Sequence, residues 1–357
     1  MFHRDQPYND LPPLPPVTSV ETPMVLKKTI RASRALAELK GMAERMPNQE
    51  MLIDSLALQE ARLSSEIENI LTTNDELYQA AADETLPASP EAKEVLRYRE
   101  ALKYGFGEIG KRPLATNLFI EIAQRIKQTT FSVRRTPGTR VVNGRGETVY
   151  TPPEGEAVIR EKLAGLERFL HEEDDGDALL KMALAHYQFE AIHPFPDGNG
   201  RTGRILNVLY LVERRLLDVP LLYVSRYVTQ HKAQYYEGLR RVTEEGAWED
   251  WVLYMLDAVE QTSLHTQQQI VDILGLIETV REQVQRAAPG VYSKDLVELV
   301  FRNPYCKIAF LERAGFGTRQ TCAKYLRELE RIGVLEGHKL GREVYFVNRG
   351  LLTRLTR

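Results

Sequence analysis

Residues 193–204 read His193-Pro-Phe-Pro-Asp-Gly-Asn-Gly-Arg-Thr-Gly-Arg204, and this is the most informative stretch of the chain. It places an imidazole, a carboxylate, several glycines and two guanidiniums between apolar segments with helical spacing. Glycines and charged side chains do not fill a hydrophobic core, so packing does not explain the mixture. A base, a metal ligand and a phosphate cradle placed together indicate chemistry on a nucleotide.

The glycine-rich segment is expected to connect two helices. Leu179–Ile192 has the pattern of an amphipathic helix, which Pro194 ends close to His193. Helical apolar spacing resumes at Ile205. The segment therefore opens a second helix, where free N–H groups and the positive end of the dipole favour anions.

Each polar residue type in the segment suits one part of such chemistry. Arg201 and Arg204, three residues apart, share a helical face and could bracket a polyphosphate. Asp197 is placed to hold Mg²⁺ against phosphate oxygens, and His193 can act as a general base.

Two other types of site match these residues less well. Gly198–Gly203 matches the G-x-G-x-x-G pattern of dinucleotide-binding folds, but no β-strand precedes it and no βαβ unit surrounds it. His171, His186 and His193 lack the spacing of a zinc site, and His186 is expected to be a polar or core residue of its helix.

The twelve residues resemble the signature of the Fic family, H-P-F-x-[DE]-G-N-G-R-x-x-R, and every specified position matches. Most members transfer AMP from ATP to a hydroxyl side chain of a target protein and release pyrophosphate. The resemblance implies that His193 deprotonates that hydroxyl, that Asp197 holds Mg²⁺, and that Arg204 grips the γ-phosphate. Asn199, Gly200 and Arg201 would line an anion hole. The residues implied in ATP binding are Asp197, Gly198, Asn199, Gly200, Arg201, Thr202, Gly203, Arg204 and Tyr236.

A hairpin is expected upstream of the motif, at Thr139–Thr151. There Asn143-Gly separates two β-branched runs, a strong hairpin signal. The hairpin resembles the family's flap, and Val141 and Val142 would hold an extended target segment by strand addition. A plain surface hairpin is the alternative.

Ser64-Ser-Glu-Ile-Glu68-Asn69 carries a second resemblance, to the family's inhibitory motif [ST]-x-x-x-E-[GN]. Ser64 and Glu68 lie on one helical face because they are four residues apart. The resemblance implies that Glu68 pairs with Arg204 and blocks seating of the γ-phosphate. The chain would then be self-inhibited by an N-terminal helix.

The predicted fold is mainly α: a Fic-type helical bundle with a hairpin flap and a C-terminal winged helix-turn-helix. The expected divisions are an N-terminal helical region at 1–95, a catalytic core at 96–265, a linker helix at 266–288 and a winged helix at 289–357. Residues 7–23 contain six prolines, which favour an extended arm before the first helix.

The winged helix is predicted from element order and charge. Helices are expected at 293–302, 308–313 and 318–332, followed by strands at 334–336 and 343–347. From Pro289 to Arg357 there are 13 Lys and Arg against 7 Asp and Glu, a net +6, whereas the whole chain carries −3. DNA binding through the third helix and through Lys339 and Arg342 of the wing remains open beside protein contacts or a homodimer.

The remaining features indicate a protein of the cytoplasm. No apolar run reaches the length of a membrane span, and the polar start is no signal peptide. Cys306 and Cys322 form no CxxC pair, which fits a reducing compartment. Three alternatives remain for function: a Fic-fold enzyme using another nucleotide, one that removes AMP, and a nucleotide-sensing DNA-binding regulator.

Overall fold

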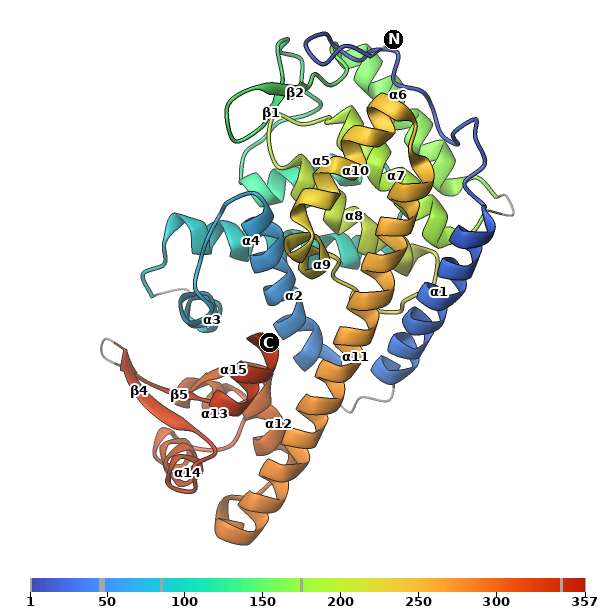
Figure 1. Cartoon of the computed structure of the whole chain (residues 1–357). Helices are drawn as coiled ribbons and strands as arrows, with labels where there is room; N and C mark the ends of the chain where they lie inside the picture. Colours follow the sequence, from blue (N-terminus) through green and yellow to red (C-terminus); the bar gives the residue numbers. More distant parts are fainter. Residues whose placement is uncertain (1, 45–48, 84–85, 174–175, 341–342, 357) are drawn as a thin grey trace. The chain divides into compact units, whose positions relative to one another are not determined.

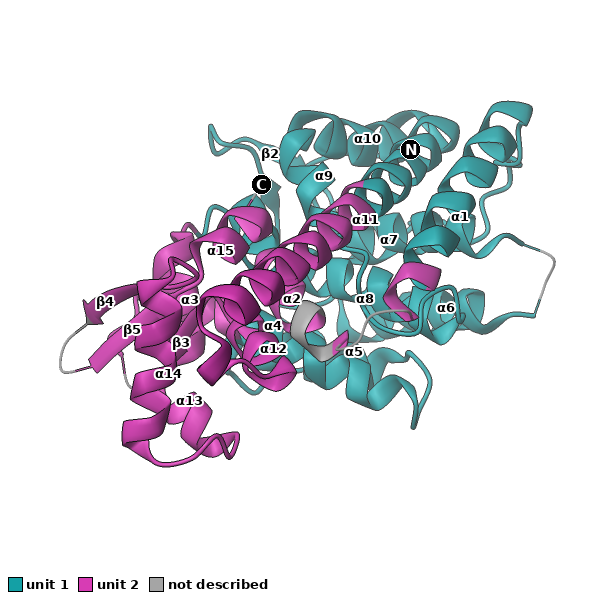
Figure 2. Ribbon diagram, turned by 90° about the horizontal axis from the view of Figure 1, so that it is seen from below, with its two compact units in different colours: residues 1–40, 60–70, 97–264 teal, residues 41–59, 71–96, 265–357 magenta. Residues whose placement is uncertain are grey.

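The chain folds into two compact units, each assembled from separate stretches of sequence (Figure 2). The computed structural model describes residues 2–44, 49–83, 86–173, 176–340 and 343–356. Unit 1 comprises residues 1–40, 60–70 and 97–264, and unit 2 comprises 41–59, 71–96 and 265–357. The domain boundaries expected from the sequence stay predictions.

The fold is mainly helical, as predicted, with short strands (Figure 1). The helices of the first two-thirds of the chain are α1 Pro23–Glu44, α2 Gln49–Ile67, α3 Asn74–Ala82, α4 Pro90–Ile109, α5 Thr116–Lys127, α6 Glu156–His171, α7 Ala178–Ile192, α8 Asn199–Glu213, α9 Ser225–Gln230 and α10 Lys232–Glu245. They are followed by α11 Trp248–Ala287, the 3₁₀ turn η1 Pro289–Val291, α12 Lys294–Arg302, α13 Ile308–Arg313, α14 Arg319–Arg331 and α15 Arg349–Thr356. No helix in the described ranges is long and apolar enough to cross a membrane.

Helix α7 lies at the centre of unit 1, packed between α6 and α8. Asp177 caps its N-terminus by accepting hydrogen bonds from the backbone N–H groups of Leu179 and Leu180. Almost every residue that follows is buried and most are apolar, so this helix is enclosed on all sides. Helix α5 packs against both α6 and α8. The two helices that flank the glycine-rich segment are thus held in a rigid apolar core.

The predicted hairpin is present in unit 1. Strand β1 (Val141–Val142) pairs antiparallel with β2 (Thr148–Tyr150). The side chain of Asn143 stabilises the turn by accepting hydrogen bonds from the N–H groups of Arg145 and Glu147. The proline-rich arm before α1 has no regular secondary structure, and its Tyr8 donates a backbone hydrogen bond to Thr151 at the end of the hairpin.

The C-terminal part of unit 2 combines helices with a three-stranded antiparallel sheet in the order β3-β5-β4. The strands are β3 Tyr305–Lys307, β4 Glu336–Leu340 and β5 Glu343–Val347. The three predicted helices are present within one residue at each end, but β3 and α15 were not predicted.

One predicted strand was misplaced: β4 begins at Glu336, where the expected strand ends, and includes residues 337–340 that were assigned to the connecting loop. Val334 and Leu335 instead donate backbone hydrogen bonds to Leu329 and close the end of α14, with Gly333 at a φ of 77°. Lys339 lies on β4, whereas Arg342 lies outside the described residues.

Candidate functional site

The segment between α7 and α8 is fixed by its own side chains. His193 ends α7 in the left-handed conformation, with a φ of 48°, and its N–H donates to the carbonyl of Phe189. Phe195 is fully buried. The side-chain amide of Asn199 accepts from the N–H of Phe195 and donates to its carbonyl, both at 2.8 Å. Asn199 therefore holds the loop closed, and its amide is committed to the backbone.

Arg134 holds the last turn of α7, a role that no local sequence pattern indicates. Its Nε donates to the carbonyl of His193 at 2.6 Å, and its Nη2 donates to the carbonyls of Pro153 and Ile192. Burial and the nearby charge of Arg134 lower the pKa of His193 to about 4. The imidazole is consequently neutral at pH 7 and able to accept a proton.

The hairpin is tied to this same turn. The hydroxyl of Tyr150 donates to the carbonyl of Ala191 at 2.8 Å, two residues before His193. Val141 is half-buried on β1, while the side chain of Val142 is exposed. Tyr150 thus links the hairpin to the turn that carries His193, a link that spacing could not indicate.

The start of α8 presents the features of an anion site. Gly198 caps the helix with a φ of 80°, a conformation that suits glycine, and the first turn presents N–H groups with no intrahelical partner. The carboxylate of Asp197 accepts from the N–H of Gly198 and pairs with Lys127 at 2.6 Å. Burial raises the pKa of Asp197, but Lys127 and Arg201 outweigh it and the pKa lies below its usual value. Arg201 is buried, 3.9 Å from Asp197.

Two glycines of α8 leave room for carboxylates. A Cβ at Gly200 would lie 2.4 Å from Oε1 of Glu68, and a Cβ at Gly203 would lie 2.5 Å from Oε1 of Glu190. Neither approach is compatible with a larger residue unless the carboxylate moves. Thr202 turns its hydroxyl back to the carbonyl of Gly198 and is fully buried.

Glu68 occupies the region beside Gly200 and meets Arg204 there. The carboxylate of Glu68 accepts from Nη2 of Arg204 at 2.8 Å. Ser64 accepts two further hydrogen bonds from Arg204, one at its hydroxyl and one at its carbonyl. Burial alone would raise the pKa of Glu68, but the charge of Arg204 outweighs it and lowers that pKa. Glu68 is therefore ionised at pH 7, and its negative charge balances the positive charge of the buried Arg204 guanidinium.

A left-handed turn presents Glu68 at the end of α2. Asn69 has a φ of 61°, and Ile70 donates its N–H back to the carbonyl of Ser65. Nζ of Lys232, at the start of α10, donates to the carbonyl of Ile67 at 2.6 Å. A cation at the C-terminal end of a helix is electrostatically favourable, so Lys232 stabilises this turn.

Tyr235 and Tyr236 lie on α10. Tyr235 is buried, and its hydroxyl lies 2.9 Å from Nε2 of His186. Tyr236 is 45% exposed and packs edge-on against Tyr235. His186 is a core residue, one of the two possibilities expected from the sequence, and of the two tyrosines Tyr236 is the one whose ring is exposed to solvent.

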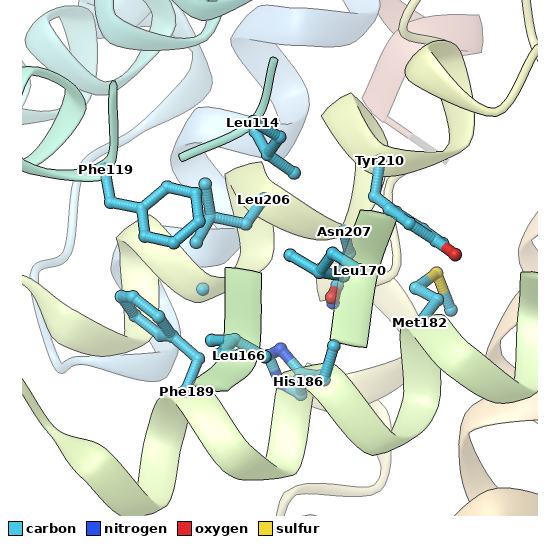
Figure 3. A pocket seen from close by; sticks show the side chains of 12 residues that line it. Leu114, Phe119, Leu166, Leu170, Met182, His186, Phe189, Leu206, Asn207 and Tyr210 are labelled. Carbon is cyan, nitrogen blue, oxygen red and sulfur yellow. The ribbon is translucent and has the colours of Figure 1, made fainter. Parts of the chain in front are cut away.

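A small cavity lies beside α7 and α8 on the core side (Figure 3). Its lining is mainly apolar: Leu114, Phe119, Leu166, Leu170, Met182, Ala185, His186, Phe189, Gly203, Leu206, Asn207 and Tyr210. It lacks the charged groups of the motif, and we assign it to the core that supports the two helices.

The geometry brings together His193, the first turn of α8, Arg204 and the Ser64–Asn69 turn. Among the described residues, no hydrogen bond or ion pair joins Val141 or Val142 to the motif. Burial raises the pKa of Tyr236 to about 12, and the charges of Glu68 and Arg204 also act on this side chain. The residues that the sequence did not indicate are Arg134, Tyr150, Glu190, Lys127 and Lys232, all distant in sequence from the motif or outside its pattern.

Within the described residues, no cluster of three His, Cys, Asp or Glu side chains could hold a metal.

Comparison with known proteins gives three family matches that together cover most of the chain. Residues 26–107 match the N-terminal model of the Fic/DOC family, residues 113–211 match the Fic/DOC family model, and residues 276–351 match the C-terminal domain of SoFic-like protein adenylyltransferases. A probable protein adenylyltransferase of Aquifex aeolicus is 38% identical over 98 residues, which are 28% of each chain. A protein adenylyltransferase, fic-1, of Caenorhabditis elegans is 30% identical over 148 residues, 41% of this chain and 25% of the relative. The matched residues cover between 14% and 28% of the length of such curated relatives.

Solved structures with a similar fold include a Fic family protein from Desulfovibrio desulfuricans G20, with a TM-score of 0.61 and 19% identity. The match covers 93% of this chain and 98% of that one. Fic-1 from C. elegans aligns with a TM-score of 0.54 and 19% identity over 69% of this chain and 74% of that one. At these identities the likeness establishes the fold.

Proposed function

Because this chain belongs to the Fic/DOC family, we propose that it is a self-inhibited protein adenylyltransferase. It would move AMP from ATP to a Ser, Thr or Tyr hydroxyl of a target protein, or of itself, and release pyrophosphate. One observation carries the proposal. The neutral imidazole of His193 is separated by one short loop from the N-terminus of α8 and from the buried guanidinium of Arg204. That arrangement suits proton removal beside a bound polyphosphate.

The reaction begins with His193. Its imidazole takes the proton of the target hydroxyl as the hydroxyl oxygen attacks the α-phosphorus of ATP. The bond from that phosphorus to the bridging oxygen breaks, and the electron pair leaves with pyrophosphate. Arg134 acts as a positioning residue, because it fixes the His193 backbone; burial lowers the pKa of the imidazole, and the charge of Arg134 lowers it further.

The start of α8 would bind the triphosphate. Backbone N–H groups of the first turn and the guanidinium of Arg201 supply positive potential there. Asn199 contributes through its backbone and through the loop that its side chain closes. Tyr236 would border the base with its exposed ring.

Asp197 fits a magnesium ion bound together with phosphates. Mg²⁺ usually takes one or two carboxylates and completes its coordination with phosphate oxygens and water. The carboxylate of Asp197 is 61% exposed and held ionised by Lys127 and Arg201. When bound, the ion would neutralise phosphate charge, while Asp197 supplies the protein ligand.

Glu68 would inhibit by occupying the γ-phosphate site. Its carboxylate uses the Nη2 group of Arg204 and the space beside Gly200 that an anion would need. A carboxylate and a phosphate cannot share that position, so the pair excludes productive binding. The hairpin would hold the target segment along Val141 and Val142, anchored to the site by Tyr150.

Incubation of the purified protein with α-³²P-ATP and Mg²⁺ tests the proposal. We expect weak labelling of protein by the wild type, strong labelling by Glu68→Gly and none by Glu68→Gly with His193→Ala. No transfer by Glu68→Gly to any protein of a cell lysate would contradict adenylyl transfer. Stronger labelling with α-labelled GTP, CTP or UTP would favour another nucleotide, and loss of AMP from a labelled target would favour removal.

The C-terminal part of unit 2 supports a second candidate function, a winged helix that binds duplex DNA. Helix α14 follows α13 after a short turn and precedes the β4–β5 hairpin, the element order of that fold. Lys324 and Arg327 are exposed on α14 and have no ion-pair partner in the described parts of the chain. Arg319 and Gln320, exposed at the start of α14, are of the types that read guanine and adenine.

Binding to a duplex of about 20–30 base pairs at increasing salt tests this second function. We expect the doubly substituted Lys324→Ala, Arg327→Ala protein to bind more weakly and to show a slope of log K against log salt smaller by about two. Lys294→Ala, an exposed lysine on α12 paired with Glu298, is the matched control. Equal binding by all three proteins would exclude α14 as the DNA surface.

A further inference from the structure

Helix α2 buries a carboxyl that the proposed reaction does not use. Glu60 is 3% exposed, and burial raises its pKa to about 7 although Ser225, Arg204 and Tyr98 act in the opposite direction. One oxygen of its carboxyl, Oε1, accepts hydrogen bonds from the hydroxyls of Tyr98 and Ser225. The other oxygen, Oε2, is buried and has no partner within the described residues. Such a group is costly to bury, so its presence calls for a physical reason.

Glu60 lies on the face of α2 that carries the inhibitory residues. Ser64 follows it by one helical turn and Glu68 by two, so the three side chains form a row. The row meets α4 at Tyr98, α9 at Ser225 and α8 at Arg204. Every contact in the row belongs to unit 1.

The last two turns of α2 are held mostly by polar contacts. Of the buried residues there, Glu60, Ser64 and Ser65 are polar, and the apolar ones are Ala61 and Ile67. An interface made of hydrogen bonds gains less from burial than an apolar one, and it weakens when one partner is lost. By contrast α7, which carries the base, is enclosed by apolar side chains over its whole length.

We propose that Glu60 is a positioning residue for self-inhibition: through Tyr98 and Ser225 it seats the end of α2 so that Glu68 meets Arg204. The inference rests on the proposed function for its consequence, since Glu68 must inhibit for its seating to matter. It assigns to Glu60 a role in the inhibited state and none in the transfer step.

Two substitutions at Glu60 distinguish an effect on the position of the end of α2 from an effect on the stability of the whole fold. Glu60→Ala removes the acceptor that the hydroxyls of Tyr98 and Ser225 share, and a buried group left unsatisfied costs about 1–3 kcal/mol. Glu60→Gln keeps an oxygen that can accept from both. We therefore expect Glu60→Ala to raise AMP incorporation about tenfold or more, whereas Glu60→Gln stays near the wild-type rate. Glu66→Ala, which removes an i,i+4 partner of Arg62 on the same helix, is the matched control.

The same changes in the Glu68→Gly background provide the decisive comparison. With the inhibitory carboxylate gone, its seating no longer limits the rate, so Glu60→Ala should leave that rate unaltered. A loss of rate in this background would mean that Glu60 merely supports the fold. An unaltered rate for Glu60→Ala in the otherwise intact chain would also overturn the proposal.

Hydrogen exchange tests the seating without any catalysis. Amides of residues 62–68 should exchange about tenfold faster in Glu60→Ala than in the wild type, and Glu60→Gln should retain their protection. Ser225→Ala, a smaller change, should give an intermediate effect if Glu60→Ala does not fold. Equal protection in all variants would refute the role of Glu60. Absence of AMP transfer by Glu68→Gly, with faster exchange in Glu60→Ala, would refute only the proposed function.

Discussion

Replacing Glu68 by glycine is the most direct perturbation of the site. The substitution removes the carboxylate that lies 2.8 Å from Nη2 of Arg204, while the guanidinium keeps its two hydrogen bonds to Ser64. The side chain of Arg204 is 1% exposed, so its charge would be left buried without its carboxylate partner. An anion from solution should then bind in place of the carboxylate.

The size of the effect follows from that one contact. A hydrogen bond between charged groups contributes about 1.5–3 kcal/mol, and each 1.4 kcal/mol changes a binding constant about tenfold. Glu68 is 36% exposed, which weakens the pair through solvent screening and favours the lower part of the range. We expect ATP to bind roughly tenfold more tightly, with about a hundredfold as the upper bound.

Calorimetric titration with ATP and Mg²⁺ measures this directly. Both the reference protein and the Glu68→Gly variant should carry His193→Ala, which prevents turnover during the titration. Glu66→Gly makes the same change two residues earlier, where the glutamate pairs with Arg62, and should leave ATP affinity near the reference value. Affinities within twofold of one another for the reference and Glu68→Gly would refute the competition between carboxylate and phosphate.

Three further predictions concern the base, the core and unit 2. AMP transfer by the Glu68→Gly variant should hold level between about pH 8 and pH 6, because the lowered pKa keeps His193 neutral; a rate that halves near the ordinary histidine pKa of about 6.5 would contradict this. Gly203→Ala should lower the thermal midpoint by a few degrees, since its Cβ would collide with Glu190 and such overpacking costs about 1–3 kcal/mol. Lys307→Ala should lower the free energy of unfolding measured in urea by about 3 kcal/mol, because the buried carboxylate of Asp83 loses its cation and keeps the hydrogen bond from Tyr345; an unchanged value would show that the two charges gain nothing by pairing.

The apolar periodicity of the sequence and its turn residues predicted the mainly helical fold well. The apolar spacing of α7, the Asn143-Gly turn and the helices α12 to α14 are local patterns, and the structure contains them. Strand β3 was missed because its three residues are all buried, so they show no alternation. The onset of β4 was misjudged because β-branched and apolar residues also serve to close the end of a helix.

Residue types indicated a chemistry for the candidate site, which stays a prediction, and they could not identify the contacts that support the site. Arg134 reaches His193 across 59 positions of sequence, and no local pattern distinguishes it from Arg135 beside it. Asn199 was expected to line an anion hole by resemblance, whereas its side chain is engaged by the backbone of Phe195. Which polar atoms are already committed depends on tertiary structure, and a motif does not contain that information.

The space beside Gly200 has a consequence for how the protein would respond to its surroundings. A carboxylate carried on the same chain is an intramolecular ligand, whose effective concentration is set by the geometry of its helix and remains the same at any protein concentration. Dilution or overexpression would therefore leave the ratio of closed to open sites unchanged. Nucleotide concentration would alter that ratio, and so would any event that loosens α2. If Glu68 inhibits as proposed, the balance between closed and open sites would depend on the stability of one helix end, where small substitutions would shift it without altering the residues proposed for catalysis.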